Sequence, residues 1–115
     1  MTVSADPYVH VATGRFVVLT CNVEPSSELA GVYVATCPAL GVTSQGDSLE
    51  EAENNIREAV SLYLTAIDED GELDRVFNEK GLRISVAADA HMAFKLPAQG
   101  GGSILAEAFP IDRAA

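Results

Sequence analysis

The side chains best suited to chemistry are few and widely separated in this sequence. Cys21 and Cys37 lie in apolar runs, and His10 and His91 lie far from each other along the chain. A metal site needs several such ligands at workable spacing, and no CxxC pair is present. A cysteine–histidine nucleophile is formally open, because sequence spacing cannot exclude it, but no other residue supports it. We therefore expect no metal, no cofactor and no enzymatic activity.

Two further patterns have a structural interpretation that is simpler than a chemical one. Residues 99–102 include three glycines but lack the lysine and the hydroxyl residue of a phosphate-binding loop, so we interpret them as a flexible turn. Tyr33 and Tyr63 could stack on a ligand, but their expected places in a strand and on an apolar helix stripe favour packing. The carboxylates are abundant and expected to be exposed, so they do not indicate a catalytic pair of acids with perturbed pKa values.

The composition describes a globular and strongly acidic chain. Its 115 residues fit one domain, 48% of them are apolar, and the formal net charge is −10. Binding to a phosphate backbone depends on clustered Lys and Arg, so the charge argues against direct binding to nucleic acid. The charge favours attraction to a basic partner, and equally an acidic surface that keeps the protein in solution.

The cysteine content and the apolar runs bear on the compartment. Two cysteines are too few for a disulfide framework, and we expect both to be buried thiols in a reducing environment. The N-terminus lacks a basic region followed by an apolar core, so no secretory signal is predicted. No apolar run approaches the roughly 18 residues that a membrane span requires. We expect a cytoplasmic protein without membrane attachment.

The first elements predicted along the chain are strands. Residues 15–23 and 31–37 are rich in Val, Thr and Cys, and their short connection predicts an antiparallel hairpin. Pro38 ends the second strand because proline cannot donate to the ladder. Residues 42–45 form a third, very short strand.

One long amphipathic helix is predicted next. Ser48 is the best N-cap and Glu51 completes a capping box, with Asp47 and Glu50 as a second register. Apolar residues then recur at steps of three and four, which predicts a helix packed on a sheet; they are Leu49, Ala52, Ile56, Ala59, Val60, Tyr63 and Ile67. Gly71 supplies the stop signal.

The remaining elements are shorter. Residues 72–81 predict a second helix, with apolar side chains at Leu73, Val76 and Phe77. Residues 82–86 alternate and predict a fourth strand. Residues 91–95 and 103–109 could add two more.

The pattern predicts an α+β fold, in which a small antiparallel sheet has the long helix packed on one face. We divide the chain into an N-terminal extension (residues 1–14), a core domain (residues 15–86) and a C-terminal extension. The last part, residues 87–115, could form an extra β-hairpin followed by a flexible tail.

Nearly all the net charge lies in the long helix and its exit. Ten acids and a single base, Arg57, fall between Asp47 and Asp74. This run is either a solvated helix face or a negative surface for a positive partner. The candidate contact residues, placed opposite the apolar stripe, are Glu50, Glu53, Asn54, Arg57 and Ser61.

The turn and helix start resemble one known family. Pro38, Leu40 and Gly41 precede a Val-Thr-x-x-Gly-Asp-Ser-Leu-Glu-Glu-Ala segment that ends at Ala52, and Tyr63-Leu64 follows on the helix. This order resembles the HicB-type antitoxins, most closely over residues 32–72 and more loosely over residues 16–86. The resemblance implies a partial RNase H-like fold.

The resemblance also implies a function. HicB-type proteins bind a small basic HicA-type toxin, an mRNA-cleaving ribonuclease, and cover its active site; they form dimers or larger assemblies and are not known for catalysis. After Val86 there are only two bases and no helical stripe, so the usual C-terminal DNA-binding module is not predicted and direct nucleic-acid binding is not expected. The alternative is a stand-alone HicB-like protein that serves as an oligomeric scaffold or small-ligand binder without a toxin.

Overall fold

The computed structural model describes residues 14–87 and 92–111 of the chain. The elements in order are β1 (Gly14–Pro25), β2 (Tyr33–Cys37), β3 (Val42–Gly46), α1 (Leu49–Glu69), α2 (Leu73–Lys80), β4 (Ser85–Ala87), β5 (Ala93–Pro97), the 3-10 turn η2 (Gln99–Gly101) and β6 (Ser103–Pro110). The predictions for residues 1–13, for the strand start at His91 and for the last four residues lie outside the described residues.

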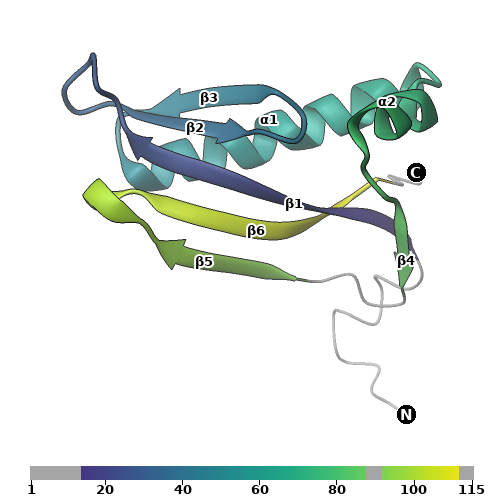
Figure 1. Ribbon diagram of the computed structural model, residues 1–115. Helices are drawn as coiled ribbons and strands as arrows, with labels where there is room; N and C mark the ends of the chain where they lie inside the picture. The colour runs from purple at the N-terminus through teal and green to yellow at the C-terminus, as the bar shows by residue number, and fades with distance from the viewer. Residues whose placement is uncertain (1–13, 88–91, 112–115) are drawn as a thin grey trace, which may run out of the picture.

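The described strands form one antiparallel sheet with the order β3-β2-β1-β6-β5, and β4 pairs with the start of β1. The long helix α1 runs across one face of this sheet (Figure 1). The predicted α+β class, with an antiparallel sheet and one long packed helix, is therefore confirmed. The finer likeness to an RNase H fold stays a prediction. No helix within the described ranges is long and apolar enough to cross a membrane.

Strand β1 is the centre of the sheet because it pairs on both sides. Its residues alternate as predicted: Val17, Leu19, Cys21 and Val23 are buried beneath α1, and the residues between them point to the other face. On its second side β1 pairs with β6 over eight residues. Strand β6 thereby adds Leu105 and Phe109 to the core, and Ile111 follows them.

The start of α1 follows the predicted capping pattern with one difference. The Ser48 hydroxyl accepts a hydrogen bond of 3.0 Å from the backbone N–H of Glu51, so Ser48 is the N-cap. The Glu51 carboxylate accepts from the N–H of Asp47, one residue before the N-cap. Side chains of the predicted stripe then enter the core; the buried ones are Ala52, Ile56 and Val60, with Leu64 added.

Two glycines permit close backbone contacts in this fold. A Cβ on Gly46 would lie 2.5 Å from the backbone nitrogen of Ala52, so only glycine lets β3 end against the first turn of α1. A Cβ on Gly102 would lie 2.1 Å from the carbonyl oxygen of Val23. The turn between β5 and β6 therefore lies directly against β1.

The C-terminal half differs from the prediction in its boundaries. Strand β4 begins at Ser85, because it pairs only with the first residues of β1, while Leu82 and Ile84 pack against the core. Strands β5 and β6 form an antiparallel hairpin, and β6 lies beside β1 within the main sheet. The division of the chain at residue 86 stays a prediction, although the sheet itself runs across it.

Candidate functional site

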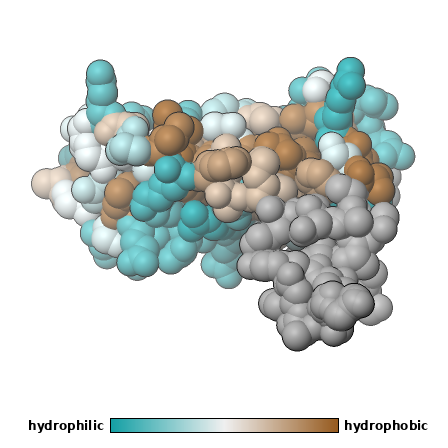
Figure 2. All heavy atoms as spheres, turned by 90° about the horizontal axis from the view of Figure 1, so that it is seen from below, coloured by the Kyte–Doolittle hydropathy of each residue, from teal (hydrophilic) through white to brown (hydrophobic). Residues whose placement is uncertain are grey.

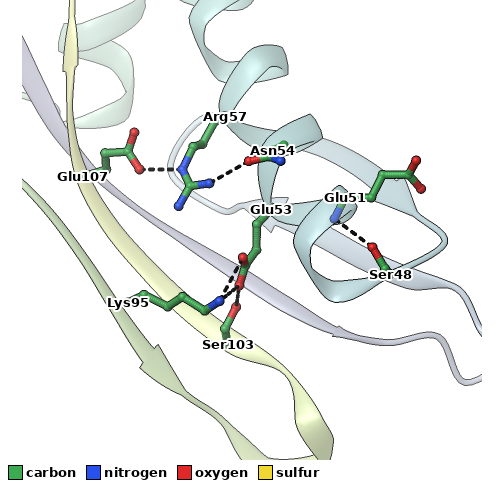
Figure 3. A network of polar contacts seen from close by, with 8 residues as sticks. All are labelled: Ser48, Glu51, Glu53, Asn54, Arg57, Lys95, Ser103 and Glu107. Atoms are coloured by element: carbon green, nitrogen blue, oxygen red, sulfur yellow. Dashed lines mark hydrogen bonds and ion pairs between the residues drawn. The ribbon is translucent and has the colours of Figure 1, made fainter.

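Three ion pairs between described residues connect α1 with the sheet (Figure 3 shows two of them). Lys95 Nζ of β5 lies 3.1 Å from Glu53 Oε2, and Arg57 Nε lies 2.8 Å from Glu107 Oε1 of β6. At the other end of the helix, Arg15 Nη2 lies 3.6 Å from Asp68 Oδ1. Three of the few basic residues are thus used to attach the helix to the sheet.

Glu53 is the most deeply buried charge in this network. The residue is 3% exposed, and its carboxylate accepts a 2.6 Å hydrogen bond from the hydroxyl of Ser103, itself 1% exposed. Burial alone would raise the pKa of Glu53, but hydrogen bonds from Ser103 and Lys95 and the charges of Lys95 and Arg57 outweigh it and lower that pKa. Glu53 is therefore held as a carboxylate and fixes the β5–β6 hairpin on α1.

The prediction that Glu53 belongs to an exposed face was wrong. The sheet is wide enough to bury a broader arc of α1 than the apolar stripe alone. Glu53 precedes Ile56 by three positions and Val60 by seven, which is the spacing of one helix face. That spacing was the signal in the sequence that could have placed Glu53 inside.

The other candidate contact residues are divided between two sides of α1. Arg57 is half-buried and turned to Glu107, and its Nη1 donates a 3.1 Å hydrogen bond to Asn54 Oδ1. Glu50 and Asn54 are exposed, and Ser61 is half-buried. The structure does not bring the five together as one surface, and their role in partner binding stays a prediction.

The exposed side of α1 is defined by a different set of residues. We call this set the outer face of α1; its members are Glu50, Glu51, Asn54, Glu58, Leu62, Ala66 and Glu69. From Glu51 onward they recur at steps of three and four, and none of the set is basic. Leu62 lies in the middle with 64% of its side chain exposed. The sequence reading missed Leu62, although its place between Glu58 and Ala66 could have indicated it.

An exposed apolar side chain within an acidic surface suits protein recognition. Desolvated apolar anchors supply most of the binding energy of many interfaces, and surrounding charges set partner choice and association rate. Within the described ranges, no group of three or more His, Cys, Asp or Glu side chains could hold a metal ion. The outer face of α1 is therefore a candidate binding surface for a basic protein.

The two cysteines are buried side by side in the core. The hydrogen bond with Cys37 and burial raise the pKa of the Cys21 thiol, while the same hydrogen bond lowers the pKa of Cys37 to about 7. Both are at most 1% exposed, so neither thiol faces a substrate. Both histidines that could complete a cysteine–histidine nucleophile, His10 and His91, lie outside the described residues. Tyr33 and Tyr63 pack against the core, as predicted.

The fold is that of a two-layer α+β protein whose long helix has an acidic exposed side. Over 41 residues the chain is 54% identical to UPF0150 protein ssr1765 of Synechocystis sp.. The matched segment covers 35% of this chain and 52% of the relative, so the chain spans about half the length of that curated protein. The similarity is consistent with a HicB-like protein. No family model and no solved structure matches the sequence.

Proposed function

We propose that this protein is a HicB-like antitoxin. It binds a small basic ribonuclease of the HicA type through the outer face of α1 and thereby keeps the toxin from its mRNA substrate. The observation that carries the proposal is the outer face itself, where exposed acids flank the exposed Leu62. The similarity to a UPF0150 protein and the helix-start motif support it.

The electrostatics of α1 favour a basic partner over other ligands. The bases nearest to the helix, Arg15, Arg57 and Lys95, are directed into ion pairs with the helix or with β6 and do not offset the outer acids. The outer face therefore presents uncompensated negative charge. Its attraction for a basic protein acts mainly on the association rate and weakens with salt.

The test is co-expression with a short basic ribonuclease encoded beside this chain. We expect a complex that co-purifies, rescue of growth from the toxin, and weaker binding as the salt concentration rises. A toxin that kills equally with and without this protein, and that forms no complex with it, would rule the proposal out.

Two variants locate the contact. The double change Glu58→Lys and Leu62→Asp should weaken the complex by at least ~100-fold, since it removes the apolar anchor and reverses a neighbouring charge. Glu28→Lys makes the same charge reversal at an exposed position in the β1–β2 connection, away from α1. This control should bind nearly as well as the unchanged protein.

The stand-alone scaffold or small-ligand binder remains the alternative function. If no basic protein co-purifies and no growth rescue is seen, the alternative is favoured. A toxin complex that survives the double change on α1 would keep the antitoxin function but move its interface to another surface.

A further inference from the structure

The two outer strands of the sheet, β3 and β5, differ in how far their edges are covered (Figure 1). At β3, the side chain of Asn55 from α1 donates a 2.8 Å hydrogen bond to the carbonyl oxygen of Gln45. In β5 every residue is exposed, and no described strand pairs with the side of β5 that faces away from β6. Strand β5 therefore presents an uncovered edge.

The hydrogen bonds between β5 and β6 determine which backbone groups of β5 point outward. At one end the N–H of Ala98 donates to the carbonyl oxygen of Gly102 over 2.9 Å. At the other end the N–H of Ala108 donates to the carbonyl oxygen of Met92, also over 2.9 Å. Residues that bond to the partner strand alternate along an antiparallel ladder, so every second residue of β5 between these two bonds is also directed to β6.

The remaining residues of β5 have their backbone groups on its free side. Ala93 and Lys95 each direct an N–H and a C=O there, whereas Pro97 directs only a C=O, because proline has no N–H. Unpaired groups in such a row are satisfied by an extended strand, whose own N–H and C=O groups continue the ladder. The backbone of β5 thus specifies the shape of what can bind to it.

The side chains along this edge alternate between apolar and basic. Phe94 and Leu96 are 63% and 61% exposed and lie on the sheet face opposite α1. Seen from the side of β5, hydrophobic side chains form a band along the molecule (Figure 2). Lys95 lies on the other face; its side chain is 51% exposed, although its Nζ lies 3.1 Å from Glu53. The edge therefore offers a positive charge between two apolar side chains.

We propose that the edge of β5 binds an extended segment of a different protein, which adds to the sheet as an antiparallel strand. The segment has an acidic residue opposite Lys95 and apolar residues on both sides of it, beside Phe94 and Leu96. Opposite charges and apolar pairs are the favourable combinations across neighbouring strands. The backbone hydrogen bonds supply affinity, and the alternating side chains supply selectivity.

The same residues oppose pairing between the β5 edges of two copies of this chain. Pairing centred on Lys95 would set one lysine directly opposite the other, and like charges there are destabilising. It would also set Pro97 of each copy opposite Ala93 of the other, where the proline has no N–H to donate. Charged side chains and prolines limit edge-to-edge association in this way. The occupant is therefore a strand of different sequence.

This inference does not rest on the proposed antitoxin function. The added strand lies at the edge of the sheet, whereas the toxin contact is proposed for the outer face of α1. A peptide that binds β5 needs no toxin, so the failure of either proposal leaves the other standing.

The test is an NMR titration of the full chain with a synthetic peptide of sequence Thr-Thr-Val-Glu-Val-Thr-Thr, blocked at both ends. We expect saturable binding. Hydrogen exchange at the amides of Ala93 and Lys95 should slow by at least ~10-fold in the complex, because these N–H groups become bonded to the peptide. The amides of Phe94 and Leu96 should change little, since they already bond to β6.

Two methylated peptides give a matched control. An N-methyl group on the glutamate removes the N–H that donates to the carbonyl oxygen of Lys95, and should weaken binding by at least ~10-fold. An N-methyl group on the first valine, whose N–H points away from β5, should leave binding nearly unchanged. A peptide with lysine in place of the glutamate should bind more weakly, because its charge lies opposite Lys95.

A pair of variants tests the protein side. Ala93→Pro removes an N–H that β6 does not use and should weaken peptide binding by ~10-fold or more, whereas Ala93→Val keeps that N–H and should bind normally. Circular dichroism and thermal melting establish that each variant is folded, and the methylated peptides decide the matter if the proline variant unfolds.

Four results would each overturn the proposal. They are the absence of saturable binding, slowed exchange confined to residues outside β5, and equal binding of the two methylated peptides. The fourth is protection of the Ala93 and Lys95 amides that grows with protein concentration in the absence of peptide, because a second copy would then occupy the edge.

Discussion

The two faces of the sheet differ in how they use charge. The face beneath α1 carries Arg15, Lys95 and Glu107 among its apolar residues, and each of these charges is paired with a residue of the helix. The sheet face opposite α1, which we call the open face, carries apolar and neutral side chains, with Glu24 as the one charge that β1, β2, β3, β5 and β6 place there. Antiparallel sheets usually show the reverse, with a dry apolar face and a polar face toward water.

This comparison shows that the solvent-exposed face of a sheet is not always its more polar face. The charged residues of the covered face form ion pairs that attach the helix to the sheet. The described side chains of the open face make no such ion pairs with α1. Strand β6 shows both roles in alternation: Leu105 and Glu107 point to α1, and Ile104 and Ala106 point away. Three sets of variants test this contrast, from the largest expected effect to the smallest.

The first set compares adjacent residues of β6. Leu105→Ala should lower the free energy of unfolding by ~2–5 kcal/mol, because Leu105 is 2% exposed and its loss leaves a cavity in the core. Ile104→Ala should cost about 1 kcal/mol or less in the monomer, since its side chain is already partly hydrated. Denaturant unfolding at low protein concentration measures both, and equal losses would contradict the assignment of the faces.

The second set compares two ion pairs. Lys95→Met should cost ~1–3 kcal/mol, because it leaves the buried Glu53 carboxylate without its cation. The control is Arg75→Met, which removes the partner of Glu72, the N-cap residue of α2, and of the exposed Glu79, and should leave the unfolding midpoint unchanged. An Arg75 variant as unstable as the Lys95 variant would show that burial does not set the size of the effect.

The third set tests the protonation of Glu53. The pKa of Glu53 is lowered in the folded protein. As the pH falls through the ordinary glutamate range, the unfolded chain therefore binds more protons than the folded protein does. The stabilisation is present above about pH 4.5 and is lost as the pH falls through the folded pKa. Glu53→Gln should therefore lose less stability on acidification than the unchanged protein. Glu58→Gln on the outer face of α1 should follow the unchanged protein, and an identical response of the two variants would refute the assignment.

Much of the fold could be predicted from the sequence because its signals are local. The alternation in β1, the cap at Ser48 and the apolar stripe of α1 each lie within a few residues of one another. At position 46 the sequence shows only that a glycine precedes the helix. The structure adds a steric reason, the close approach of β3 to Ala52.

The candidate site was harder to predict because it depends on contacts between distant segments. Glu53 is buried by Lys95 and Ser103, which lie more than 40 positions further along the chain. Strand β6 pairs between β1 and β5. Hydrophobic periodicity can predict that a segment is a strand, but not which strands it pairs with. The apolar pattern of the helix alone therefore predicts neither the extent of the open face nor the direction of Arg57 toward β6.

The strand order has a consequence for synthesis of the chain. Val23 and Ser103 are neighbours in the sheet but lie 80 positions apart. Chains are synthesised at ~5–20 residues per second, so the edge of β1 that pairs with β6 stays unpaired for roughly 4–16 s during synthesis. During that time its unpaired edge and the apolar residues beside it are open to other chains. The nascent protein thus depends on β6, or on a chaperone, to avoid aggregation.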